Sequence, residues 1–356
     1  MKHRSAGGLI VFTMILYTLP GCTQETEVFE SRLATLGTFA RISIAGLTPE
    51  QARAAADATE QTLKSLDHIG YGFGAGGELQ RVNDALANGR TITVSGEMTD
   101  LLDKARGLSL ASGGLFNPAA GELTALWKFQ CEQEVCVTPP TYPTGVQTRI
   151  GEKVARVLER TPSMDDLMIR GNRVSSRNRR VRLDFGEVIR TLALDIGIER
   201  LRRAGATNAM IEIGGNVHAS GTRGDHAWWV GIPDASGRHL IGSIETGDDE
   251  SVVTVRALDT SAGWQDSVYR RIVDPRNGLP AGEVQSVTVV HHSAMLANAA
   301  ATALMIAGRQ DWKTVADRMD VPALLMIDRS DTIYTSPAID HRIHWKQGVT
   351  HQHLVP

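Results

Sequence analysis

The stretch Ala209-Met210-Ile211-Glu212-Ile213-Gly214-Gly215-Asn216 contains an apolar strand that ends at a pair of glycines. A short apolar run of this kind is typical of a strand in the interior of a domain. The glycines allow the backbone to approach another group closely, so they indicate either a turn or a loop that lies against a ligand phosphate. The stretch therefore predicts a buried strand and leaves the role of the glycines open.

Further strands and helices alternate on both sides of this segment. Alternating apolar residues indicate the strands, and an apolar period of 3.6 residues with capping residues indicates the helices. The expected strands are 36–44, 180–185, 209–213 and 287–290, and the expected helices are 48–66, 95–108, 189–201 and 293–306. Residues 129–150, rich in Pro, Thr and Gly, are expected to form an excursion from the domain. Since no linker divides the chain, we expect an α+β fold in one compact body with two lobes.

The composition narrows the class of protein. The chain has 356 residues, 42% of them hydrophobic and 22% charged, with a net charge of −3. This argues against a disordered, collagen-like or multi-span membrane protein. Because Lys and Arg form no long block, we expect no nucleic-acid partner.

The N-terminus resembles an export signal. Lys2 and Arg4 precede an apolar run over residues 9–19, and Gly21-Cys22 follow. A basic start, a short apolar segment and small residues at its end are typical of a cleaved signal peptide. Cys22 after Gly21 resembles a bacterial lipobox, so residues 1–21 are expected to be a lipoprotein signal peptide. Residues 22–32 would be the lipidated Cys and a tether, anchoring the protein to a membrane facing the periplasm. The alternative is an uncleaved membrane anchor.

Two further cysteines, Cys131 and Cys136, lie five residues apart in a segment followed by prolines. In an oxidising compartment this spacing favours a local disulfide. A metal site is the weaker interpretation, because no His lies near them in the sequence.

Several short motifs could carry chemistry. Asp184-Phe185-Gly186-Glu187 places two carboxylates where a strand meets a helix, which suits either a helix cap or a site for a nucleotide and a hard cation. Asn298 and Thr302 are four residues apart, so they share one helix face and offer oxygen ligands; the alternative is simple packing among alanines.

Two loops complete this set. Gly113-Gly114-Leu115-Phe116-Asn117-Pro118 has an apolar tip that could bracket a flat ring or simply pack into the core. Asp274-Pro275-Arg276-Asn277-Gly278 has the chemistry of a tight hairpin, with positive φ values at Asn-Gly. Each of these two loops alone favours the purely structural interpretation, whereas the two interpretations of residues 184–187 stay balanced.

The order of the segments resembles one family. The series comprises Leu36-Gly37-Thr38, Glu78 to Asn83, Gly113 to Pro118, Leu126-Trp127, Leu183-Asp184-Phe185-Gly186, Ala193-Leu194-Asp195, Ile211 to Val217, Trp229 to Ile232, Thr260-Ser261, Ile272 to Gly278 and Ser293 to Leu304. Over nearly all of the chain after the signal peptide, it resembles the ApbE family, the FAD:protein FMN transferases.

This resemblance implies an ApbE-like, T-fold-related architecture and an exported enzyme. Such an enzyme takes FAD as substrate and, with Mg²⁺, moves its FMN half onto a Thr or Ser hydroxyl of an acceptor protein, releasing AMP. The implied acceptors are flavoprotein subunits of membrane redox complexes. The implied flavin-nucleotide contacts are Leu36, Phe73, Leu115, Phe116, Asn117, Asp184, Arg190 and Ile272. The implied metal positions are Ile189 (through its carbonyl), Asn298 and Thr302, and no catalytic base is assigned.

The chain departs from the family pattern at four places. Residues 184–191 replace the family's Asp-Leu-Gly-Gly-Ile-Ala-Lys-Gly, and Asn117 replaces the Asp of Phe-Asp-Pro. Asn298 replaces a metal-binding Asp, which removes a negative charge and should weaken Mg²⁺ binding. Arg271 replaces a His that is a candidate base, and Arg cannot accept a proton at neutral pH. Glu187 or Asp195 could take over some of the metal binding.

Two functions therefore remain. The first is an Mg²⁺-dependent FMN transferase. The alternative is a catalytically impaired lipoprotein on the same fold that binds flavin or a respiratory partner. The expected domain covers residues 33–340, followed by a C-terminal tail over 341–356.

Overall fold

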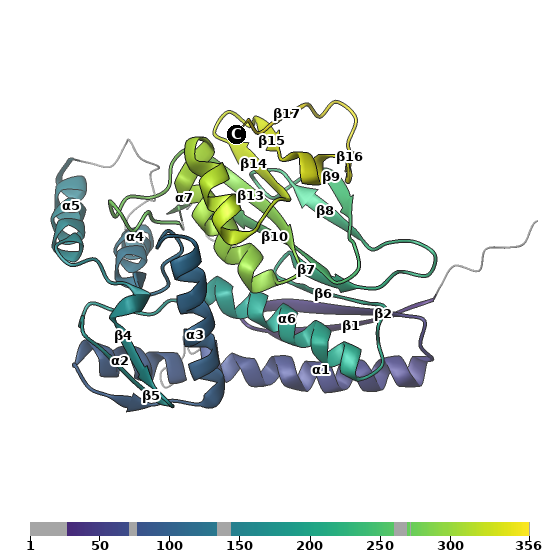
Figure 1. Cartoon of the computed structure of the whole chain (residues 1–356), viewed down its shortest axis with the longest axis horizontal. Coiled ribbons are helices and arrows are strands. Elements are labelled where there is room, and N and C mark those ends of the chain that lie inside the picture. The colour runs from purple at the N-terminus through teal and green to yellow at the C-terminus, as the bar shows by residue number, and fades with distance from the viewer. Residues whose placement is uncertain (1–26, 71–76, 134–143, 260–268, 271, 356) are drawn as a thin grey trace, which may run out of the picture.

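The computed structural model describes residues 27–70, 77–133, 144–259, 269–270 and 272–355. A nine-stranded sheet forms its centre, in the spatial order β1-β2-β6-β7-β10-β13-β14-β15-β17 (Figure 1). Its strands are β1 (Val28–Thr35), β2 (Thr38–Ala45), β6 (Ala209–Ile213), β7 (Asn216–Ser220), β10 (Glu250–Arg256), β13 (Val284–His291), β14 (Leu324–Asp328), β15 (Ile333–Thr335) and β17 (His351–His353). Neighbouring strands are antiparallel except β15 and β17.

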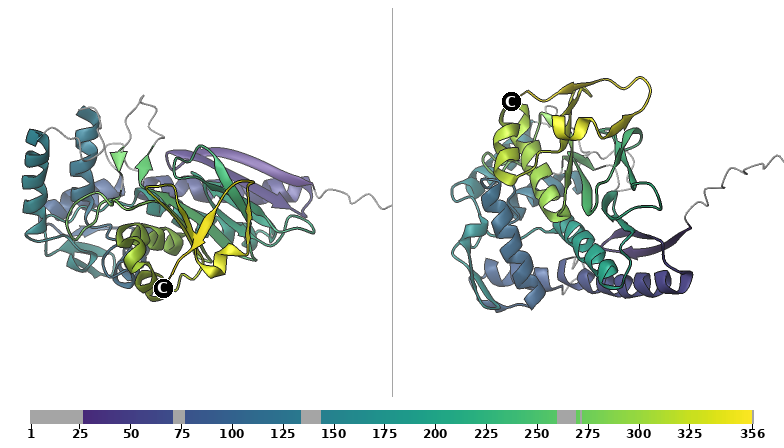
Figure 2. Two further views of the ribbon diagram at one scale, coloured as in Figure 1. Left: turned by 90° about the horizontal axis from the view of Figure 1, so that it is seen from above. Right: turned by 45° about the vertical axis from the view of Figure 1, so that its right-hand side comes forward.

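The two faces of this sheet are covered differently. The helices α1 (Pro49–Gly70), α6 (Gly186–Arg203) and α7 (Ala294–Met319) cover one face (Figures 1 and 2). On the other face, a second core joins the large sheet to a three-stranded sheet. The strands of this sheet are β16 (Ile343–Trp345), β9 (Leu240–Glu245) and β8 (Trp229–Pro233).

A mainly helical lobe packs beside the sheet. It contains α2 (Glu78–Ala87), α3 (Gly96–Ala111), α4 (Gly121–Gln133), α5 (Thr144–Leu158), the 3₁₀ turn η1 (Met164–Asp166) and the small sheet β3 (Ile92–Thr93), β5 (Arg173–Ser176), β4 (Leu167–Arg170). The short elements β11 (Leu258–Asp259), β12 (Tyr269–Arg270) and α8 (Pro337–Asp340) complete the described chain. One continuous core includes Leu101 and Met164 of the lobe and Ile211 and Leu304 of the body. This shared core confirms an α+β fold in one compact body.

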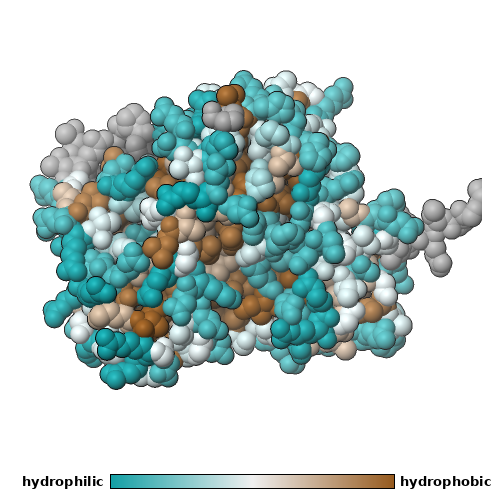
Figure 3. Space-filling view, in the orientation of Figure 1, coloured by the Kyte–Doolittle hydropathy of each residue, from teal (hydrophilic) through white to brown (hydrophobic). Residues whose placement is uncertain are grey.

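Figure 3 shows the hydropathy of the face that carries the helices. Apolar side chains visible on this face gather where α3, α6 and α7 meet in Figure 1, and hydrophilic side chains surround them. Within the described residues, none of the helices has both the length and the apolar character that a membrane span needs.

Local signals in the sequence are confirmed where they depend on near neighbours. The Thr48 hydroxyl accepts a hydrogen bond from Gln51 N, and the Gln51 side chain accepts one from Thr48 N, so the expected capping box begins α1. Ser95 caps α3 by accepting a hydrogen bond from Met98 N.

The paired glycines form a turn between two strands. Gly214 and Gly215 have φ values of 59° and 87°, and they join β6 to β7 with Ile213 opposite Asn216. Both residues lie in the left-handed region that glycine adopts without steric cost. Of the two interpretations of these glycines, the structure therefore shows the turn.

Three expected boundaries differ. The expected tether over 22–32 overlaps β1, because Val28–Thr35 pairs with β2 along its whole length. The expected C-terminal tail contains β16 and β17, and Leu354 is buried in the main core. The excursion over 129–150 overlaps α4 and α5, and α5 packs Val154 and Val157 against Leu123 of α4.

Several expectations lie outside the described residues. These are the signal peptide, Cys22, Phe73, Cys136 and with it the expected disulfide, Thr260-Ser261 and Arg271.

Candidate active site

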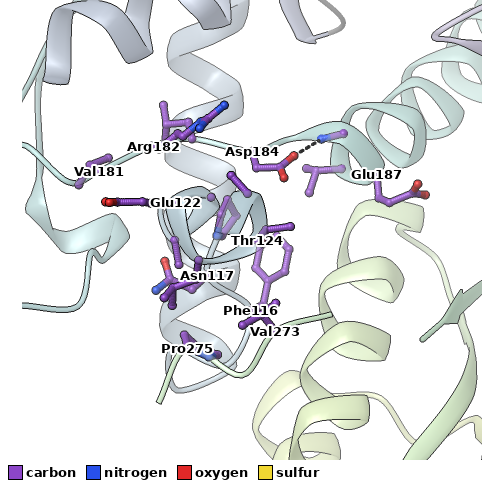
Figure 4. A pocket seen from close by; sticks show the side chains of 18 of the residues that line it. Phe116, Asn117, Glu122, Thr124, Val181, Arg182, Asp184, Glu187, Val273 and Pro275 are labelled. Atoms are coloured by element: carbon purple, nitrogen blue, oxygen red, sulfur yellow. Dashed lines mark hydrogen bonds between the residues drawn. The ribbon is translucent and has the colours of Figure 1, made fainter. Parts of the chain in front are cut away.

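A cavity of about 1100 Å³ lies between the helical lobe and the sheet body (Figure 4). Its walls are α2, residues 115–118, the start of α4, residues 179–184, the start of α6, residues 272–275 and the first half of α7. Residues far apart in the sequence therefore face one space. Eight of the residues indicated by the family resemblance line it: Leu115, Phe116, Asn117, Asp184, Arg190, Ile272, Asn298 and Thr302. Leu36 and Ile189 are fully buried and do not line it.

The segment before α6 forms one wall but is not the strand expected over 180–185. Its side chains alternate, with Val181, Leu183 and Phe185 buried and Arg182 and Asp184 exposed. Its backbone pairs with residues 118–121 through single hydrogen bonds, and only one residue pair of it is a β-bridge. The segment therefore has alternating side chains, but the expected strand is wrong because the segment forms no regular ladder.

The loop that carries Phe116 and Asn117 is held by hydrogen bonds and packing. Phe116 is 5% exposed and belongs to the main core, although it also lines the cavity. The Asn117 amide donates to the Pro162 carbonyl at 2.8 Å and accepts from Ala119 N at 3.2 Å. Asn117 thus shapes the cavity wall through contacts to backbone.

Charged groups meet at the start of α6. The Asp184 carboxylate accepts a hydrogen bond from Gly186 N at 3.1 Å, which occupies one of the free N–H groups of the helix start. Glu187 pairs with Arg190 at 2.9 Å, and Arg190 Nε donates to the Leu36 carbonyl at 3.2 Å. Leu36 therefore acts through its backbone, and it holds the Arg190 guanidinium at the cavity wall.

Basic side chains line the cavity from the lobe to the body. Arg179, Arg180 and Arg182 come from one segment, and Arg190 comes from α6. Arg180 lies 3.5 Å from Glu122, whereas among the described residues Arg182 forms no ion pair. Guanidinium groups bind phosphate oxygens in paired hydrogen bonds, so this arrangement suits an anionic ligand. Sequence reasoning missed Arg179, Arg180 and Arg182. For Arg180 and Arg182 the signal was their alternation with Val181 and Leu183, and Arg179 had none.

Asn298 and Thr302 lie one helical turn apart on α7 and both line the cavity. Asn298 is only 2% exposed, and its Nδ2 atom has no hydrogen-bond partner in the described part of the chain. A buried N–H donor without an acceptor costs free energy, so Asn298 Nδ2 needs an acceptor atom from a ligand or an ordered water.

Asn298 and Thr302 of α7 offer side-chain oxygen atoms as metal ligands, which suits a hard cation such as Mg²⁺. No group of three or more His, Cys, Asp or Glu side chains arranged to hold a metal exists among the described residues. Asp195 does not line the cavity, and its carboxylate accepts hydrogen bonds from the start of α7. The expectation that Asp195 substitutes as a metal ligand is therefore wrong. Glu187 does line the cavity, but Arg190 neutralises it.

The turn over 274–278 lies beside Ile272 and Val273 at the cavity wall. The guanidinium of Arg276 donates to both oxygens of Asp274, and these hydrogen bonds raise the pKa of Arg276 above its usual value despite partial burial. Gly278 has a φ of 69°, whereas the φ of Asn277 is not positive. The expected turn is present, with one left-handed residue in place of two.

Comparisons with known proteins agree with this geometry. The ApbE family model matches residues 36–325. An FAD:protein FMN transferase of Rhodobacter capsulatus is 31% identical over 343 residues, which cover 96% of this chain and 62% of that protein. This chain therefore spans less than two thirds of that relative's length. A protein of the same name from Vibrio cholerae is 26% identical over 331 residues, covering 89% of this chain and 92% of the relative.

Solved structures show the same fold. The ApbE protein of Thermotoga maritima superposes with a TM-score of 0.74 at 24% identity, covering 89% of this chain and 99% of that one. The flavin transferase ApbE from Vibrio cholerae gives 0.71 at 24% identity, with the same coverage of both chains. Because the family model covers most of the sequence and the fold agrees, the chain belongs to the ApbE family.

Proposed function

We propose that the protein is an FAD:protein FMN transferase, which moves the FMN half of FAD onto a Thr or Ser hydroxyl of an acceptor protein and releases AMP. The observation that carries this proposal is the single cavity in which Phe116, Asp184, Arg190, Ile272 and Asn298 meet, although they come from distant parts of the chain. Family membership supports the same activity.

The chemistry of the walls suits the two halves of the substrate. Leu115, Phe116 and Ile272 offer apolar surface to a flat ring, and Arg182 and Arg190 offer guanidinium groups to the pyrophosphate. The cavity volume of about 1100 Å³ is slightly above the usual range for small-molecule sites, about 300–1,000 Å³, which leaves room for an acceptor hydroxyl beside FAD. In the reaction, that hydroxyl oxygen bonds to the FMN phosphorus, the bridging P–O bond breaks towards AMP, and the hydroxyl proton is released.

We also propose that Mg²⁺ binds together with the pyrophosphate. Asn298 and Thr302 would supply neutral oxygens, and Asp184 would supply a carboxylate. Mg²⁺ commonly uses one or two carboxylates together with phosphate oxygens and water, so a cage of protein carboxylates is not required. When bound, the ion would neutralise charge on the phosphates. The unpartnered Nδ2 of Asn298 is a hydrogen-bond donor, so it supports an acceptor such as a phosphate oxygen of the substrate beside this position.

The proposed location is a membrane surface facing the periplasm, with the protein anchored through a lipid on Cys22. The acceptor would be a flavoprotein subunit of a membrane redox complex. The sequence of residues 1–22 supports this location. Membrane fractionation of Cys22→Ser tests it, since this variant should move to the soluble periplasmic fraction while the unsubstituted protein stays with the membrane.

The activity is tested by incubating the purified protein without residues 1–21 with FAD, Mg²⁺ and a Thr-bearing acceptor, and then measuring the mass of the acceptor. The acceptor should gain one FMN, and an acceptor with Thr→Ala should gain none. If FAD binds but the acceptor never gains FMN, the protein is the flavin-binding lipoprotein without transfer activity.

A further inference from the structure

Asp195 of α6 is bonded to the first turn of α7. One carboxylate oxygen lies 2.7 Å from Ala294 N, and the other lies 2.8 Å from Ser293 Oγ and 3.2 Å from Met295 N. These donors are the groups that a helix start leaves without partners inside the helix. The negative charge also lies at the positive end of the helix dipole, which stabilises the contact.

Capping alone does not require this carboxylate. Ser293 already caps α7, because its hydroxyl accepts a hydrogen bond from Leu296 N at 3.2 Å. Asp195 belongs to a different helix, 98 residues earlier in the chain than Ser293. Its bonds therefore attach α7 to α6 in addition to capping α7.

Asp195 is itself held from the sheet. His218 of β7 is 3% exposed, and its Nδ1 lies 3.0 Å from Asp195 Oδ1. The Nε2 atom of His218 lies 3.1 Å from Asp249, which pairs with Arg202 at 2.7 Å. A side chain with partners on both sides has little rotational freedom, so the position of the Asp195 carboxylate is fixed before it meets α7.

Residues of the same two helices line the cavity. Arg190 lies five residues before Asp195 on α6, and Asn298 lies four residues after Ala294 on α7. At 1.5 Å per residue, Asn298 is about 6 Å along the helix from the Asp195 contact. A shift or rotation at this contact therefore moves Asn298 and Thr302 relative to Arg190.

We propose that Asp195 is a positioning residue, which fixes the start of α7 against α6 and thereby sets the positions of Asn298 and Thr302 relative to Arg190 in the cavity. The inference rests on the proposed function of that cavity. Asp195 touches neither FAD nor the acceptor; it acts through α7.

The first test compares Asp195→Asn with Thr48→Ala. Thr48→Ala removes the cap of α1, a helix that does not line the cavity among the described residues. Both variants should lower Tm, and both are assayed well below it. Asp195→Asn should lower kcat at saturating FAD at least tenfold, with the KM for acceptor unchanged, while Thr48→Ala keeps kcat within twofold. An unchanged kcat in Asp195→Asn would overturn the proposal.

The second test is a double-mutant cycle with Asn298→Ala, since residues that act through one another give non-additive effects. In the Asn298→Ala background, Asp195→Asn should lower kcat less than threefold. If Asp195→Asn lowers kcat as much in the Asn298→Ala background as in the unsubstituted protein, the positioning role is overturned and the proposed function is unaffected. A normal kcat in Asn298→Ala by itself counts instead against the proposed function of the cavity. If Asp195→Asn does not fold, His218→Gln replaces it in both tests, with a smaller loss expected because it removes one bond to Asp195.

Discussion

The side chain of Asn83 makes two hydrogen bonds to the backbone of Leu183, 100 residues away. Its Nδ2 donates to the Leu183 carbonyl at 3.0 Å, and its Oδ1 accepts from Leu183 N at 2.7 Å. This paired contact joins α2 to the segment that presents Arg182 and Asp184 to the cavity. The amide therefore replaces the neighbouring strand that the segment lacks on this side.

Asn83→Ala should destabilise the protein and weaken FAD binding. The substitution leaves the Leu183 N–H and carbonyl without their protein partner, at a cost of about 1–3 kcal/mol. Urea unfolding measures the loss of stability, and flavin fluorescence titration measures FAD affinity. Asn88→Ala is the control, because Asn88 bonds only within the exposed end of the same helix. Unaltered FAD affinity in Asn83→Ala would show that the segment needs no such support.

Asn298→Asp should strengthen Mg²⁺ binding. A carboxylate in place of the amide adds a negative charge to the oxygen donors that α7 presents to the cavity. Calorimetric titration of Mg²⁺ in the presence of FAD measures the change, and a tenfold tighter Kd corresponds to about 1.4 kcal/mol. Gln352→Glu adds the same charge at an exposed position of β17 and should leave Mg²⁺ affinity unchanged. An identical Kd in Asn298→Asp would place the cation elsewhere.

Arg190→Lys should weaken FAD binding about tenfold, or ~1.4 kcal/mol. Lysine keeps the charge but loses the planar guanidinium, which donates one hydrogen bond to the Leu36 carbonyl and another to the Glu187 carboxylate. The matched control is Arg203→Lys on the same helix, where the arginine is exposed and pairs with Glu199. Equal FAD affinity in both variants would exclude a specific role for the Arg190 guanidinium.

The stability of the protein should fall as the pH drops below about 6.5, the usual pKa of histidine. Burial lowers the pKa of His291, and the neighbouring His292 lowers it further. The unfolded chain therefore binds a proton at a higher pH than the folded one, so acidification favours unfolding in the interval below 6.5.

Urea unfolding between pH 7 and pH 5 measures this effect. His291→Gln should give a shallower dependence of the unfolding free energy on pH in that interval. His341→Gln, which removes an exposed imidazole, should leave the dependence unchanged. If His291→Gln has the same slope as the unsubstituted protein, another group carries the proton linkage.

The residues that line the cavity could be predicted from the sequence to a large extent. The order of motifs placed Leu115, Phe116, Asp184 and Asn298 in one site, and the cavity contains all four. Leu36 was indicated by the same order, but it acts through its carbonyl on Arg190. Neither spacing nor residue type distinguishes a side-chain contact from a backbone contact.

The sequence by itself determined the features that depend on near neighbours. The capping box at Thr48 and the cap at Ser95 each involve residues within about four positions, so residue type is enough to specify them. The sequence left a turn and a ligand loop open at Gly214 and Gly215, and the structure contains the turn.

Only the tertiary structure decided which distant groups meet. Asp195 could have been a metal ligand by its chemistry, yet it bonds Ser293 and His218 because α6 crosses the start of α7 beside β7. Leu183 takes a side-chain partner from α2 in place of a neighbouring strand. A carboxylate or a backbone amide accepts many partners equally well, so its role is set by which segment the packed core brings within 3 Å.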